Sequence, residues 1–133
     1  ANLVDIEGIG AAYADKLGAQ GVKSTGDLLA AGATPKGRKD LEAATGISGA
    51  LILKWVNKAD LFRVKGIGTQ YSDLLEAAGV DTVAELGQRR ADNLSAKMAE
   101  VNAEMVFVRP LPTEKQVADW IAGAKELSRA VTY

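Results

Sequence analysis

Apolar and polar residues alternate with the period of an α-helix along most of the chain. Tyr13 and Leu17 lie one helical turn apart, and Gly21 marks where this helix is expected to stop, because glycine accepts the left-handed terminal conformation. Strand-like alternation is nearly absent, and the one short β-favouring run spans residues 105–108. The pattern therefore predicts an all-α protein.

Hydroxyl side chains mark the expected starts of several helices. Ser24 or Thr25 stands before one apolar pair, and Ser48 stands before a longer apolar stripe. Such side chains accept a hydrogen bond from a free amide in the first helical turn. Thr113 is followed three residues later by Gln116, which predicts a reciprocal capping box at the start of the last helix.

One block of the sequence occurs twice. Residues 6–29 align with residues 64–87 at a constant offset of 58, and ten of the 24 aligned pairs are identical. A later block around Trp55 aligns with one around Trp120 at an offset of 65. Repetition of glycines and large apolar residues at a fixed spacing indicates an internal duplication.

The duplication predicts the domain organisation. Copy one is expected to span residues 1–58, and copy two residues 59–127 with an inserted segment near 101–112. Residues 128–133 form a tail with no counterpart. We expect tandem helical hairpins in each copy, with the two copies packed together as a pseudo-symmetric pair.

Each copy begins with a Gly-Ile-Gly turn between two helices, at residues 8–10 and 66–68. The first glycine allows a sharp turn, the isoleucine inserts into the core, and the second glycine leaves the next helix N-terminus bare. Exposed amides and the positive helix end then form a site for an anion such as a phosphate oxygen.

Residues 6–17 and 64–75 resemble the helix-hairpin-helix motif of many DNA repair and replication proteins. Over residues 3–127 the chain is also similar to a mostly bacterial family described as domain of unknown function 4332, most clearly at residues 51–57, 71–83 and 117–121. The motif resemblance implies sequence-independent contact with the nucleic-acid backbone. The residues to which it assigns that contact are Gly8, Ile9, Gly10, Lys65, Gly66, Ile67 and Gly68.

Several features depart from a DNA-binding pattern. Ala11 and Thr69 stand where the motif usually carries Lys or Arg, and Glu7 lies inside the first turn. Sixteen Lys and Arg against 17 Asp and Glu give a net charge of -1, so no global basic field attracts nucleic acid. A local basic rim at Lys36, Arg38 and Lys39 is the remaining candidate.

A protein-protein interaction or assembly module that binds no nucleic acid is the alternative. Its candidate surface is the apolar run of Met105, Val106, Phe107 and Val108 in copy two. The recurring aromatic residues are assigned to packing: Trp55 and Trp120 to the core, and Tyr13 and Tyr71 to half-buried positions.

The composition argues against catalysis and against a metal site. The chain has no histidine and no cysteine, which removes the commonest general base and the usual transition-metal ligands. We therefore expect no enzyme activity, no catalytic residues, no cofactor, no metal and no small-molecule substrate. With no long apolar run and no leader-like segment, we also expect a cytoplasmic protein without membrane contact.

Overall fold

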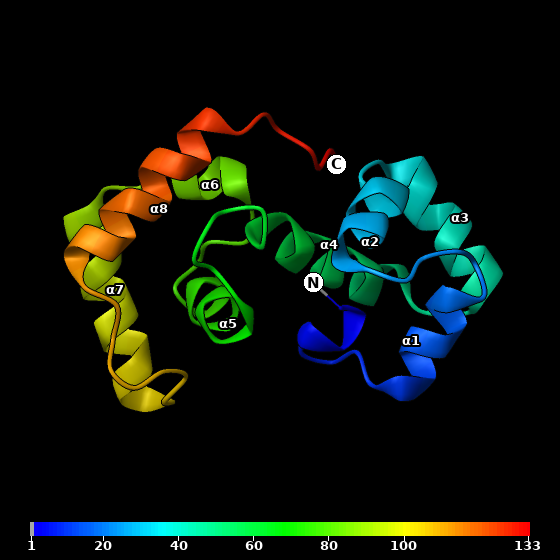
Figure 1. Ribbon diagram of the computed structural model, residues 1–133, viewed down its shortest axis with the longest axis horizontal. Helices are drawn as coiled ribbons and strands as arrows, with labels where there is room; N and C mark the ends of the chain where they lie inside the picture. Colours follow the sequence, from blue (N-terminus) through cyan, green and yellow to red (C-terminus); the bar gives the residue numbers. More distant parts are fainter. Residues whose placement is uncertain (1) are drawn as a thin grey trace. The chain divides into compact units, whose positions relative to one another are not determined.

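The computed structural model describes residues 2–133, and that part of the chain is all-helical, as predicted (Figure 1). No strand occurs within it; its isolated β-bridge joins Asn2 to Ser24. None of its helices combines the length and apolar character needed to cross a membrane. The elements are η1 (Leu3–Asp5), α1 (Ala11–Gly18), α2 (Thr25–Gly32), α3 (Pro35–Thr45), α4 (Gly49–Leu61), α5 (Thr69–Ala77), α6 (Val83–Gly87), α7 (Ala91–Glu104) and α8 (Glu114–Glu126).

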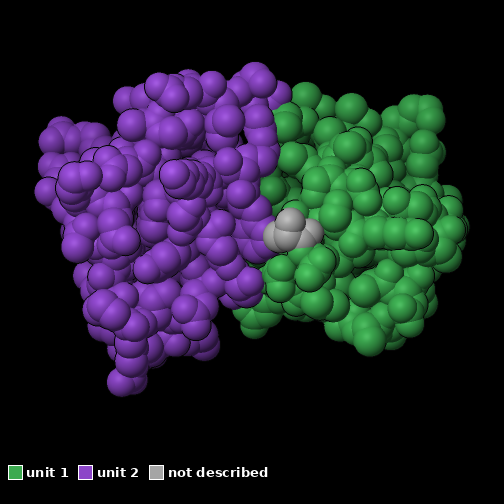
Figure 2. All heavy atoms as spheres, in the orientation of Figure 1, with its two compact units in different colours: residues 1–60, 130–133 green, residues 61–129 purple. Residues whose placement is uncertain are grey.

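Two compact units divide the chain (Figure 2). Unit 1 runs to Asp60 and also takes in residues 130–133, whereas unit 2 spans Leu61–Arg129. The sequence predicts a division between residues 58 and 59 and a separate tail at residues 128–133. The structure instead returns the chain to unit 1 after unit 2 is complete.

Helix starts in unit 1 follow the predicted capping residues. Ser24 is the N-cap of α2, and its hydroxyl accepts a hydrogen bond from the Asp27 amide at 3.1 Å. The Ser48 hydroxyl accepts one from the Leu51 amide at 3.3 Å, at the start of α4. α3 begins at a proline, where a missing N–H costs nothing because the first-turn amides lack helical partners.

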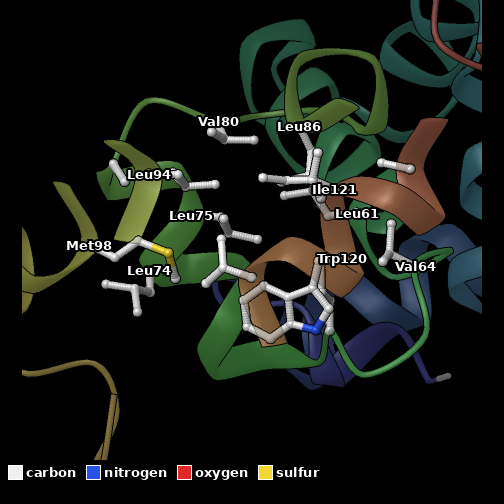
Figure 3. Close-up of a cluster of buried hydrophobic side chains, with 14 of the residues drawn as sticks. Leu61, Val64, Leu74, Leu75, Val80, Leu86, Leu94, Met98, Trp120 and Ile121 are labelled. Carbon is white, nitrogen blue, oxygen red and sulfur yellow. The ribbon is translucent and has the colours of Figure 1, made fainter. Parts of the chain in front are cut away.

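The core of unit 2 is a cluster of apolar side chains from α5 to α8, from Leu61 at the end of α4 and from the connecting segments (Figure 3). Leu74 and Leu75 are fully buried, and burial of such a side chain contributes about 1.5–3 kcal/mol. The labelled members in Figure 3 are Leu61, Val64, Leu74, Leu75, Val80, Leu86, Leu94, Met98, Trp120 and Ile121. α8 starts with the predicted capping box between Thr113 and Gln116.

The segment predicted as an insertion, near residues 101–112, contains the end of α7 and a coil. α7 runs to Glu104 and has 14 residues, against 11 in α3. The remainder connects α7 to α8, and its β-favouring residues form no strand. Val108 from this coil is buried in the core of unit 2.

Candidate phosphate-binding turns

Both Gly-Ile-Gly turns have the same backbone conformation. Gly8 and Gly66 have φ values of 96° and 94°, which L-residues with a side chain rarely adopt. The amide of the following isoleucine donates to a carbonyl three residues back, from Ile9 to Ile6 at 3.1 Å and from Ile67 to Val64 at 3.2 Å. Ile9 and Ile67 are buried, as the turn chemistry predicts.

A tryptophan lies directly beneath the first glycine of each turn. A Cβ atom added to Gly8 would lie 3.2 Å from Nε1 of Trp55, and one added to Gly66 would lie 3.1 Å from Nε1 of Trp120. The first glycine is therefore required twice, once by its backbone angle and once by the indole below it. In each unit the turn is thus supported by the core.

Each tryptophan also packs against the tyrosine of the helix that follows the turn. The ring centroids of Tyr13 and Trp55 are 5.1 Å apart with an interplanar angle of 58°, and those of Tyr71 and Trp120 are 4.9 Å apart at 55°. Both tryptophans are buried and both tyrosines are half-buried. The predicted packing role of these four aromatic residues is confirmed.

The second glycine of each turn has a different character. Gly10 and Gly68 are the N-caps of α1 and α5; both are exposed, in extended conformation, and without a side-chain cap. A Cβ atom at either position would meet no other atom within 4 Å. In contrast, α2, α3, α6 and α8 all have a Ser or Thr hydroxyl that accepts a first-turn amide. α1 and α5 therefore begin at a residue that offers no side-chain acceptor to the amides of the first turn.

The two turns differ in charge. Glu7 is exposed in the first turn, and Lys65 is exposed at the equivalent position of the second. Neither α1 nor α5 has an acidic residue in its first turn. The electrostatic field of Lys65 and the α5 N-terminus is positive in sign at the second turn, whereas Glu7 adds a negative charge at the first.

The proposed basic rim does not exist as a single surface. Arg38 is buried, and its guanidinium donates to the carbonyls of Gly32 at 2.9 Å, Ala33 at 3.2 Å and Thr132 at 2.7 Å. The Lys36 ammonium donates to Asp40 at 2.8 Å, and this hydrogen bond and charge pair raise the pKa of Lys36. Lys39 is exposed. Arg38 is thus withdrawn from any phosphate-facing role.

The apolar run of residues 105–108 is also split by the structure. Met105 and Val106 have exposed fractions of 66% and 50%, whereas Phe107 and Val108 pack on the core of unit 2. Asn102 of α7 holds the segment: its Oδ1 accepts from the amides of Phe107 at 2.8 Å and Val108 at 3.2 Å. A protein-binding surface here is therefore limited to the first two residues.

Residues that could hold a metal ion do not gather in the described part of the chain: no group of three or more Asp, Glu, His or Cys side chains is placed for it.

Three residues with structural roles were not predicted from the sequence. They are Arg38 as a buried donor, Asn102 as a loop anchor, and Val131, which is buried although it lies in the tail. Their contacts join segments whose pairing no periodic pattern shows.

Comparison with known families places these turns in context. Residues 7–127 match the family described as Domain of unknown function (DUF4332). The chain belongs to the DUF4332 family. Both turns, at residues 8–10 and 66–68, fall inside the matched range, as does the coil that contains Met105. Neither the curated proteins nor the solved structures provide a significant match.

Proposed function

We propose that this DUF4332 chain is a non-enzymatic module that binds the nucleic-acid backbone without reading its sequence. In this proposal the chain is a tandem duplication, and each Gly-Ile-Gly turn is a helix-hairpin-helix motif. Gly66, Ile67 and Gly68 form the main contact together with Lys65, and the turn at residues 8–10 adds a weaker one. The ligand group is a phosphate oxygen that accepts hydrogen bonds from backbone amides where the turn leads into the following helix. The Ile67 amide itself donates to the Val64 carbonyl, so Ile67 contributes by holding the turn in shape.

One observation supports the proposal most strongly: the fold has no steric need for glycine at positions 10 and 68. Their φ values of -91° and -116° suit any residue, and a Cβ atom would contact nothing. A Ser or Thr there would cap the helix, as it does at five other helices of the described chain. Glycine at these two positions is instead suited to the close approach of a ligand to the backbone.

Electrostatics favours the second turn over the first. Lys65 adds a positive charge beside the α5 N-terminus, and Glu7 adds a negative one beside the α1 N-terminus. Because a net charge of -1 supplies no general attraction, affinity depends on this local field. We therefore expect weak, salt-sensitive binding dominated by unit 2.

A mobility-shift series with single- and double-stranded DNA and RNA tests the proposal. Gly68→Glu should abolish binding, because it places a carboxylate at the N-terminus of α5 without a steric clash in the protein. Gln88→Glu is the matched control: it adds the same charge at another exposed position of unit 2 and should bind like wild type. Affinity that stays constant between about 50 and 200 mM salt would contradict phosphate contacts.

A second function has one specific observation in its favour. Met105 and Val106 are large, adjacent and exposed apolar residues on the coil after α7. Such a pair favours contact with another protein. Replacement of both by Ser should leave the fold intact and dissolve any complex detected by light scattering, whereas a monomeric wild type would remove this alternative.

A further inference from the structure

Unit 2 has an open groove on its surface. None of the residues assigned to phosphate binding lines this groove. Its volume is about 530 Å³, and its lining comes from α8 and from the residues that begin α7. Ala118, Ile121 and Ala122 give it an apolar wall. A groove of this size accommodates a short peptide or a small molecule.

The rim of this groove is mainly basic. Arg89, Arg90 and Lys125 line it, against the carboxylates of Asp92 and Glu114. Arg90 pairs with Asp92 at 2.9 Å, and this hydrogen bond lowers the pKa of Asp92. Both side chains are more than half exposed, so the pair is weak and can be exchanged for contact with a ligand carboxylate.

In unit 1 the corresponding face is filled by the chain itself. The Thr132 amide donates to the Ala33 carbonyl at 2.8 Å, and Arg38 donates to the Thr132 carbonyl at 2.7 Å. The Tyr133 hydroxyl donates to Oδ1 of Asn57 at 3.1 Å, and Val131 is buried. Residues 130–133 are thus held as a peptide, by main-chain hydrogen bonds and by side-chain burial.

Two independent anchors relate this face to the groove. Ala33 immediately precedes the N-cap of α3, and Arg89 immediately precedes the N-cap of α7. Asn57 of α4 aligns with Ala122 of α8 at the offset of 65 found in the sequence. One residue of each pair contacts residues 130–133, and the other lines the open groove.

We infer that the groove of unit 2 binds an extended peptide segment of a partner protein, one that carries an aliphatic side chain and a carboxylate. The aliphatic group would lie against Ala118 and Ala122, and the carboxylate would pair with the Arg89, Arg90 and Lys125 rim. The inference rests on the proposed duplication and is independent of nucleic-acid binding. The way in which unit 1 holds residues 130–133 is the model for how the groove would hold a peptide. The basic rim of the groove is the reason that its ligand would carry a carboxylate.

The face of unit 1 that holds residues 130–133 and the groove of unit 2 differ in one hydrogen-bond donor. The residue four positions after the α3 N-cap is Arg38, whereas the residue four positions after the α7 N-cap is Leu94, which is buried in the core. Guanidinium groups in unit 2 come instead from positions 89 and 90, which line the rim. The exposed guanidinium of Arg89 also donates to the Gly79 carbonyl at 2.9 Å. A ligand there is therefore held by its charged group more than by its main-chain carbonyl.

Titration of the ¹⁵N-labelled full chain with the peptide Ser-Arg-Ala-Val-Thr-Tyr, which has a free carboxylate, tests the inference. Saturable shifts of the amides of residues 89–92 are expected, and an amidated peptide should bind about tenfold more weakly because it lacks the charge. Absence of shifts at millimolar peptide would overturn the inference. Gly68→Glu should leave peptide binding unchanged, which separates this result from that of the nucleic-acid test.

Two variants distinguish the groove from the filled face of unit 1. Ala122→Glu places a long side chain, with the same charge as the ligand carboxylate, in the groove from an exposed position and should weaken binding at least about tenfold. Arg38→Ala alters only the unit 1 face and should not change affinity. Shifts confined to residues 33–38 and lost in Arg38→Ala would show displacement of residues 130–133, and would overturn the assignment to unit 2. Shifts of residues 89–92 on concentrating the chain alone would identify a second copy, not another protein, as the occupant.

Discussion

At the scale of single residues, the glycines of each turn divide into two kinds. Gly8 and Gly66 combine positive φ with a tryptophan indole beneath them, so the fold itself requires them. Gly10 and Gly68 have ordinary φ values and open space around them. Stability and binding should therefore depend on different members of the same three-residue turn.

Gly66→Ala should destabilise unit 2 by about 1–3 kcal/mol, because alanine must adopt a strained φ and push against Trp120. Gly68→Ala should change stability by less than about 1 kcal/mol, since its backbone and surroundings accept a Cβ atom. Urea denaturation of both variants measures the difference. Equal loss in the two would contradict this division of roles.

Arg38 shows where residue-level reasoning from sequence fails. It stands among Lys36, Lys39 and Asp40, and such a charged stretch normally indicates a solvent-exposed surface. In the structure it is buried, and its guanidinium donates to three carbonyl oxygens, two at the end of α2 and one of Thr132. Only the three-dimensional position of those carbonyls reveals the role.

Arg38→Ala should lower the free energy of unfolding of unit 1 by about 2–3 kcal/mol, because it leaves buried carbonyls without their charged donor. Lys39→Ala, at the exposed neighbouring position, should stay within about 0.5 kcal/mol of wild type. Thermal denaturation gives both values. If Arg38→Ala leaves the free energy of unfolding unchanged, water must replace the guanidinium as the donor to these carbonyls without loss of stability.

At the scale of elements, capping residues in the sequence correctly predicted where helices begin, because helix capping depends only on residues close together in the chain. Ser24, Ser48 and Thr113 each cap the helix expected of them, because a hydroxyl and a free amide a few residues away suffice. The point at which α7 ends and the coil of residues 105–113 begins was not predictable. It depends on Asn102, whose amide group pairs with residues five and six positions along the chain.

Asn102→Ala should destabilise unit 2 by about 1–2 kcal/mol and free the coil after α7, since two amides lose their shared acceptor. Hydrogen exchange of the Phe107 and Val108 amides should accelerate, while that of the α8 amides should not. Asn102→Asp keeps the acceptor and loses the bond from Nδ2 to the Val108 carbonyl, so its effect should be smaller. A larger loss of stability in Asn102→Asp than in Asn102→Ala would contradict the role of Oδ1 as the acceptor of these two amides.

At the scale of the whole molecule, the repeat in the sequence pointed to two parts, and the structure has two compact units. The match between residues 6–29 and 64–87 carries this information, because it conserves apolar positions as well as glycines. The return of residues 130–133 to unit 1 has no counterpart in the repeat. Pairing of Thr132 with Ala33 spans most of the chain and leaves no periodic trace in the sequence.

Thr132→Pro should lower the stability of unit 1 selectively by about 1–2 kcal/mol, because proline cannot donate to the Ala33 carbonyl. The two tryptophans offer one indole N–H signal for each unit, Trp55 for unit 1 and Trp120 for unit 2. In a ¹H–¹⁵N denaturation series the Trp55 signal should shift its midpoint, and the Trp120 signal should not. Thr132→Ala, which keeps the amide, is the control.

Unit 1 is built from two segments that lie at opposite ends of the chain, and this limits the order in which the protein can fold during synthesis. Domains generally fold in the order of their synthesis. Here the segment that covers Arg38 and Asn57 is translated only after all of unit 2. The amino-terminal half therefore emerges first and is completed last, so a nascent chain must pass through a stage in which this face is bare.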